Sequence, residues 1–224
     1  DPDLESPSVT IAWQHNGNII SSESTLLLDS DTFQKEDWVE CLATATDSYD
    51  GIQTATESVE IQNSPPILNT LSITPLLPTT QDTIECIPSD IVDIDNDEVN
   101  FKYRWFVNGV EDQTTESSFS GNLAVEDVIQ CEVTVSDSDD VGNSLTVETM
   151  IQNTPPSIDS ISLFPSTPEA DTLIECLSTV SDVDNQSTTI THQWTVMGNV
   201  LGSDSILQLH PEIVQPNDSI ECSI

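Results

Sequence analysis

Acidic side chains stand at alternate positions in a short stretch, DIDNDEV, that spans residues 93–99. Asp93, Asp95 and Asp97 lie at fixed distances of 12, 10 and 8 residues before Trp105. Alternate residues of an extended loop present their side chains to one side, so these three carboxylates can converge. Hard oxygen ligands at this spacing suit Ca²⁺. The stretch therefore predicts half of a calcium site.

The same pattern lies at the same distance before two other tryptophans, and this recurrence argues against a chance arrangement. It is not an EF-hand, because Glu98 stands where that loop needs Gly and Arg104 stands where it needs a bidentate Glu. The alternative is a solvated acidic rim, as in a halophilic or marine protein. The matching residues are Asp1, Asp3 and Glu5 before Trp13, and Asp182, Asp184 and Gln186 before Trp194.

The cysteines recur with a regular spacing that indicates an internal repeat. Successive gaps between them are 45, 45, 45 and 46 residues. The motif NSPP at Asn63 returns as NTPP at Asn153, a shift of 90 residues, so each repeat contains two cysteines. A repeat of about 90 residues suits a small two-sheet sandwich. The five positions are Cys41, Cys86, Cys131, Cys176 and Cys222.

The order of Cys and Trp within each repeat predicts the fold. A Cys…Trp…Cys order is typical of immunoglobulin domains, in which a disulfide joins two sheets and the Trp packs against it. We expect two such bonds, and we expect the partner of Cys41 to lie about 45 residues upstream, outside this sequence. Unpaired buried thiols are the alternative, since disulfides form only in an oxidising compartment. The expected pairs are Cys86 with Cys131 and Cys176 with Cys222.

Strand patterns support an all-β fold of tandem immunoglobulin-like β-sandwiches with inter-sheet disulfides. In NFKYRWFVNG, alternate residues from Phe101 to Val107 can face a core, and in DVIQCEVTVSD those from Ile129 to Val135 can do so. Each sandwich should contain about seven strands, and the Pro-Pro segments should be stiff linkers. The expected divisions are 1–65, a repeat that lacks its front; 66–155, a complete repeat; and 156–224, a repeat that stops early.

A second set of acids follows the second cysteine of each repeat. In an immunoglobulin sandwich this loop lies at the same end as the loop before the Trp strand, so the two acidic sets should converge. We expect Asp93, Asp95 and Asp97 to face Asp137 and Asp140, close to the linker from the preceding repeat. A cation would relieve the repulsion among so many carboxylates. The second set comprises Asp47 and Asp50 after Cys41, and Asp137, Asp139 and Asp140 after Cys131.

These motifs resemble the tandem Ig-like repeats, related to the PKD and cadherin-like classes, of very long secreted or surface proteins of bacteria and archaea. The resemblance rests on DTIEC, NFKYRWFVNG, DVIQCEVTVSDSDD and VETMIQNTPP, and it covers essentially the whole chain. It implies an extracellular location and a role in stalks, adhesins or surface layers. It also implies that calcium stiffens the junctions, as in cadherin-like arrays.

Composition restricts the partners. The 224 residues include 40 Asp plus Glu against 3 Lys plus Arg, a formal net charge of −37, which argues against nucleic acid or an anionic membrane as a partner. No stretch is long and apolar enough to insert into a membrane. We expect neighbouring repeats, and other copies in a filament, to be the partners.

We expect no enzymatic activity. His15, His192 and His210 occupy different positions relative to their nearest Trp, and no nucleophile and base motif is present. Two function classes remain. One is a structural rod that forms a surface stalk or filament, and the other is an adhesin-type module that binds carbohydrate or protein. Near-constant repetition favours the rod, because a rod works by its length.

Overall fold

The computed structural model describes residues 6–224, and every regular element in this range is a β-strand. The strands form five sheets whose neighbouring strands pair antiparallel. No helix within these residues could cross a membrane. The predicted fold class, all-β with tandem immunoglobulin-like sandwiches, is confirmed.

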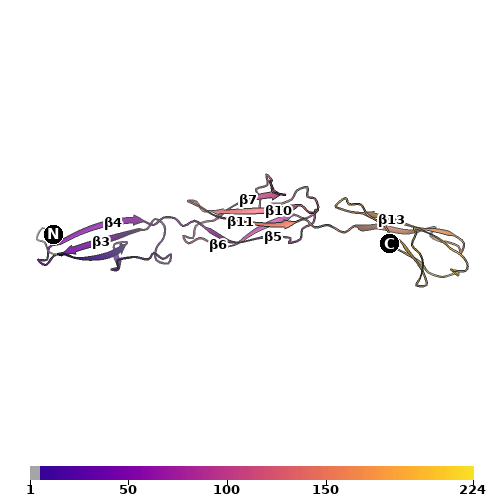
Figure 1. The fold of residues 1–224 in the computed structure, drawn as a ribbon, viewed down its shortest axis with the longest axis horizontal. Helices are drawn as coiled ribbons and strands as arrows, with labels where there is room; N and C mark the ends of the chain where they lie inside the picture. Colours follow the sequence, from indigo (N-terminus) through magenta and orange to yellow (C-terminus); the bar gives the residue numbers. More distant parts are fainter. Residues whose placement is uncertain (1–5) are drawn as a thin grey trace. The chain divides into compact units, whose positions relative to one another are not determined.

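The first repeat forms one sheet with the strand order β2-β1-β3-β4. Trp13 lies opposite Cys41 in the β1/β3 register, and both residues are half-buried. Cys41 is a free thiol. The neighbouring strands β3 and β4 run side by side in the indigo to purple part of Figure 1. The strands are β1 (Ser8–His15), β2 (Asn18–Ser21), β3 (Trp38–Thr46) and β4 (Ile52–Glu60).

The middle repeat contains seven strands in two sheets, as expected of an immunoglobulin sandwich. One sheet has the order β11-β10-β7-β8 and the other has the order β5-β6-β9. The strands are β5 (Ile67–Thr74), β6 (Ile84–Val92), β7 (Asn100–Val107), β8 (Val110–Glu111), β9 (Ser118–Phe119), β10 (Val128–Ser136) and β11 (Val141–Met150).

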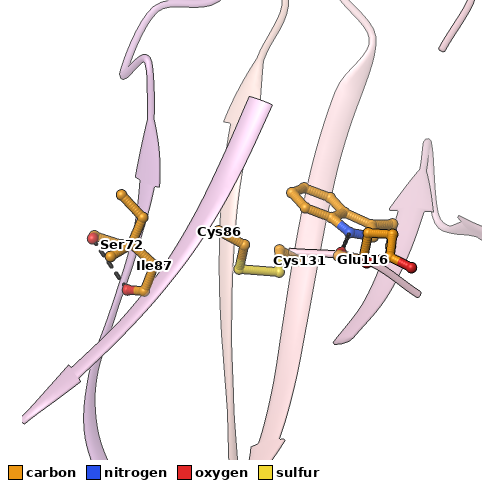
Figure 2. Close-up of a disulfide and its surroundings, with 6 residues drawn as sticks. Ser72, Cys86, Ile87, Glu116 and Cys131 are labelled. Carbon is orange, nitrogen blue, oxygen red and sulfur yellow. Dashed lines mark hydrogen bonds between the residues drawn. A yellow bond between two sulfur atoms is a disulfide. The ribbon is translucent and has the colours of Figure 1, made fainter. Parts of the chain in front are cut away.

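A disulfide and a buried indole hold these two sheets together. Cys86 of β6 bonds to Cys131 of β10, and Figure 2 shows this bond between the two strands. Trp105 of β7 lies opposite Cys131 and is fully buried. Its indole N–H donates to the carbonyl of Glu116 at 2.9 Å. The expected inward residues of β10 are all buried: Ile129, Cys131, Val133 and Val135.

Phe101 departs from the predicted strand pattern. Its side chain is 40% exposed, although Trp105 on the same strand is completely buried. Strand β7 begins only at Asn100, so Phe101 lies at the end of the sheet. There it lines a shallow cavity of about 470 Å³ with Asp93 and Asp97 of the acidic loop. Trp105 is the buried residue of this strand, and its neighbours on both faces are half-buried or exposed, so the predicted alternation is not resolved in β7.

The third repeat reproduces the same core. Cys176 of β13 bonds to Cys222 of β17, and Trp194 lies opposite Cys222 with no exposed surface. The indole N–H of Trp194 donates to the carbonyl of Asp204 at 2.8 Å. The sheets have the orders β12-β13-β16 and β15-β14-β17. The strands are β12 (Ser157–Phe164), β13 (Leu173–Ser181), β14 (Gln193–Val196), β15 (Asn199–Gly202), β16 (Ile206–Gln208) and β17 (Ile220–Ser223).

The boundaries of the sheets differ from the boundaries of the compact units into which the chain folds. Every sheet lies within one of the three predicted repeats. The division into 1–65, 66–155 and 156–224 stays a prediction. The chain forms two compact units, one of Asp1–Thr74, Ile84–Phe119 and Ile129–Glu148 and the other of Pro75–Thr83, Ser120–Val128 and Thr149–Ile224.

The middle disulfide should be the main covalent support of its sandwich. Replacing both Cys86 and Cys131 with Ser should lower the free energy of unfolding by about 2–4 kcal/mol, because the bond closes a long loop. Chemical denaturation followed by tryptophan fluorescence measures this loss. Cys41→Ser is the control, since Cys41 forms no disulfide and should keep unfolding near wild type.

Candidate metal site at the acidic loops

The first acid of the DIDNDEV stretch folds the loop on itself. The Oδ1 atom of Asp93 accepts the backbone N–H groups of Asp95 at 2.9 Å and Asp97 at 3.2 Å. Between these two residues, Asn96 has a positive φ of 60°, a conformation that Asn tolerates better than most residues. The loop is therefore a compact turn, and its three carboxylates do not line up on one side.

The third repeat builds the same turn. The Oδ1 atom of Asp182 accepts the backbone N–H groups of Asp184 at 2.9 Å and Gln186 at 3.2 Å. Asn185 has the same φ of 60°. The pattern read from the spacing before each Trp thus corresponds to one recurring local structure.

The second acid of each turn binds the linker that enters the repeat. Asp95 Oδ2 accepts the backbone N–H of Ser64 at 2.6 Å, and Asp184 Oδ2 accepts that of Thr154 at 2.6 Å. Two prolines, which lack an N–H, follow each donor. The donated N–H is therefore the last backbone donor of the linker before the prolines, and the acid fixes it.

A second acidic loop, between β10 and β11, is organised by Asp137. Its Oδ1 atom accepts the backbone N–H groups of Asp139 at 2.7 Å and Asp140 at 2.6 Å. Its Oδ2 atom accepts the side-chain amide of Asn63 at 3.0 Å, and this amide also donates to Asp140 at 3.1 Å. These donors, with the Asn63 amide first, hold the pKa of Asp137 below its usual value. The carboxylate therefore stays ionised although its residue is only 8% exposed.

Three of the predicted ligands converge. Asp93, Asp97 and Asp137 each bring one carboxylate oxygen within 4.8 Å of the others. The Oδ2 atom of Asp93 is buried and accepts no hydrogen bond within the part of the chain that the structure describes. A buried oxygen without a partner costs free energy that a bound cation would offset. The group thus fits a hard cation with oxygen ligands, which these residues would share with water or backbone.

Asp95, Asp139 and Asp140 do not belong to this convergent group. Asp95 binds the linker and Asp140 binds Asn63, as described above. Asp139 Oδ2 accepts the ammonium of Lys35 at 2.7 Å. The predicted six-carboxylate site is therefore divided in the structure among a convergent trio, linker acceptors and an ion pair.

Lys35 is the functional residue that the sequence interpretation missed. Its Nζ atom lies 2.5 Å from Asp97 Oδ2 and 2.7 Å from Asp139 Oδ2, so it bridges both acidic loops. These hydrogen bonds, with Asp139 first, raise the pKa of Lys35, and the hydrogen bond from Lys35 lowers the pKa of Asp139. The sequence offered no local signal for this contact, because Lys35 lies 62 residues from Asp97 and 104 from Asp139.

The corresponding acids of the other repeats have other contacts. Asp184 Oδ1 accepts the hydroxyl of Thr80 at 2.5 Å, and this bond followed by that from the Thr154 N–H lowers the pKa of Asp184. Asp47 Oδ1 accepts the backbone N–H groups of Tyr49 at 2.8 Å and Gly51 at 2.7 Å. Asp50, exposed in the same turn, has a φ of 62°. The predicted ligands Asp1, Asp3 and Glu5 lie outside the described residues.

Comparisons with known proteins give only distant structural similarities. No family model and no curated protein matches the sequence. The FN1–FN3 domains of chicken CNTN1 share 11% identity at a TM-score of 0.35, over 99% of this chain and 84% of that one. The immunoglobulin domains 1–5 of Sidekick-1 share 12% identity at a TM-score of 0.32, over 98% of this chain and 54% of that one. Similarity at this level carries no functional information.

Removing the linker acceptor should release the linker. In Asp95→Ala, the partly buried N–H of Ser64 loses its acceptor, so we expect its amide to exchange faster and the free energy of unfolding to fall by about 1–3 kcal/mol. Hydrogen exchange measured by NMR reports both effects. Glu98→Ala in the same loop is the control, because Glu98 is exposed. Equal exchange of Ser64 in both variants would contradict the assignment.

The ion pair of Asp139 should respond to pH in a defined direction. Its pKa in the folded state lies below the unfolded value of about 3.9, so its stabilising effect is complete above about pH 5 and is lost as the pH falls through the folded pKa. The destabilisation caused by Asp139→Asn should therefore be constant from about pH 5 to 8 and shrink below about pH 4. Urea denaturation across this range measures it. A destabilisation that grew towards low pH would refute the pairing.

Proposed function

We propose that this chain is a structural part of an extracellular array, in which tandem Ig-like sandwiches are joined through acidic junctions into a surface stalk or filament. The repeated linker contact carries the proposal. Asp95 with Ser64 and Asp184 with Thr154 form the same hydrogen bond at the same length of 2.6 Å. A hydrogen bond that fixes the linker in successive repeats restricts how each repeat is oriented relative to the next. A stalk requires this restriction, whereas a single binding site does not.

The disulfides support an extracellular location. Cys86–Cys131 and Cys176–Cys222 are both formed, and such bonds persist in oxidising environments. We propose a role without catalysis. Neighbouring repeats of the same chain are the first partners. Other copies are the second, through the edge strand β4, which is exposed along its whole length and can accept an added strand.

Calcium is the cation that we propose for the convergent trio. Asp93, Asp97 and Asp137 offer oxygen ligands only, and the chain's large negative charge attracts cations to this end of the sandwich. A bound ion would link the loop before β7 to the loop after β10. Because both loops also contact the linker through Asp95 and Asn63, the ion would stiffen the junction.

The alternative is an adhesin-type module that recognises carbohydrate or protein. Such a role would use exposed aromatic side chains, and Trp38 and Tyr49 are 55% and 79% exposed. The residues at the same distance from the second cysteine of the middle repeat are Val128 and Asp139. The aromatic positions therefore do not recur between these two repeats, and the structural role accounts for more of the chain.

Calcium should stabilise the wild-type chain. Relative to chelator, we expect millimolar Ca²⁺ to raise the melting temperature by about 5 °C, with a Kd of about 10⁻⁴–10⁻³ M, the range typical of extracellular modules. Differential scanning calorimetry and isothermal titration calorimetry measure these values. Small-angle scattering should show lower interdomain flexibility with Ca²⁺.

Asp93→Asn is the matched variant for this experiment. Asn keeps the Oδ1 acceptor that folds the loop and replaces the buried Oδ2 with an amide that cannot bind a cation, so the calcium response should disappear. Glu98→Gln removes the same charge from an exposed position and should retain the response. An unchanged melting temperature and scattering profile for the wild type with and without Ca²⁺ would refute the calcium proposal.

A further inference from the structure

The ammonium of Lys35 donates to three side-chain oxygens. Besides Asp97 and Asp139, its Nζ atom donates to the side-chain oxygen of Asn63 at 3.4 Å. The side chains of Lys35 and Asp97 are only 23% and 22% exposed. Lys35 follows β2 in the first repeat, whereas both acids belong to the loops of the middle repeat. The ammonium therefore joins parts of two repeats within one compact unit.

The turn that carries Lys35 is a fixed feature of the repeat. The acid at its end accepts a backbone N–H three residues earlier: Asp37 from Gln34 at 3.0 Å, and Asp127 from Ala124 at 2.7 Å. The residue before that acid has a positive φ, 69° for Glu36 and 72° for Glu126. The third repeat repeats both features, with Asp218 accepting from Gln215 at 2.7 Å and a φ of 76° at Asn217.

The final Asp of the turn is the same in every repeat, whereas the side chain two residues before it differs in charge. The residue before the positive-φ position is Lys35 in the first repeat, Val125 in the second and Pro216 in the third. Val125 has no donor for an acid, and in its unit it lines a cavity of about 690 Å³ together with Thr80 and Asp184. The cavity beside Lys35 is smaller, about 250 Å³. One turn thus provides a cation in the first repeat and an apolar side chain in the second.

We propose that Lys35 is a built-in cation of the first acidic junction, a clamp that holds the turn of residues 34–37 to both acidic loops of the next repeat without a metal ion. An ammonium donates up to three hydrogen bonds, and here each of them has an oxygen acceptor. A divalent cation that takes Asp97 as a ligand must compete with Lys35 for it. This second consequence rests on the proposed calcium site, whereas the clamp itself does not.

Hydrogen exchange in the presence of chelator tests the clamp alone. In the 224-residue chain, Lys35→Gln should accelerate amide exchange at Ser64, Asp97 and Asp139 by about two- to fivefold, because the loops lose a shared partner. Lys102→Gln is the control, since it makes the same charge change at an exposed strand position. Lys35→Arg keeps the charge and should restore most of the protection. Exchange in Lys35→Gln equal to that of wild type in chelator would overturn the proposal.

Calcium titration of the same variants separates the clamp from the calcium site. Removing the competing ammonium should raise the affinity of Lys35→Gln for Ca²⁺ relative to wild type and Lys102→Gln. If neither wild type nor Lys35→Gln binds Ca²⁺ while exchange is still faster in Lys35→Gln, the calcium proposal fails and the clamp is supported. If Lys35→Gln binds Ca²⁺ no more tightly than Lys102→Gln does, the proposed competition is overturned.

Discussion

Unbalanced negative charge is the constraint on which the rest of this structure depends. With 40 acidic side chains and 3 Lys or Arg, ion pairs cannot neutralise the carboxylates, so those that gather at the sandwich ends need other donors. The backbone supplies them. Asp93, Asp137 and Asp182 each accept two N–H groups from their own loop, which spreads the charge over peptide dipoles and folds the loop at the same time.

The junctions follow from this use of backbone donors. Once the first acid of a turn has folded the loop, the second acid points outward to the incoming chain and accepts its last N–H before the prolines. Pro65 and Pro66 limit the backbone there, and Asp95 holds the residue in front of them. Stiffness at the junction therefore arises from covalent restriction on one side and a charge-assisted hydrogen bond on the other. A cation in the convergent trio would add to this arrangement and is not needed for it to form.

The sequence predicts the fold well because periodic signals determine it. Alternation in β10, the position of Trp105 and the spacing of the cysteines correctly indicated a two-sheet sandwich with a Cys86–Cys131 bond. The acidic site was harder to predict from the sequence. Side chains at alternate positions lie on one side only in an extended chain, and the positive φ of Asn96 makes this segment a turn. The contact between Lys35 and Asp97 spans 62 residues of sequence and leaves no local pattern.

The turn of residues 34–37 has the same backbone structure in each repeat but presents different side chains. The turn of residues 34–37 keeps its hydrogen bond and its positive φ in every repeat, so these features belong to the sandwich itself. The side chain that the turn presents is free of that requirement, and it changes from Lys35 to Val125. The residue of the third repeat that corresponds to Asp97 is Gln186, so the second junction lacks both the ammonium and the acid that it binds. An array built this way can vary its response to ions from joint to joint through single substitutions, with no change in the sandwich.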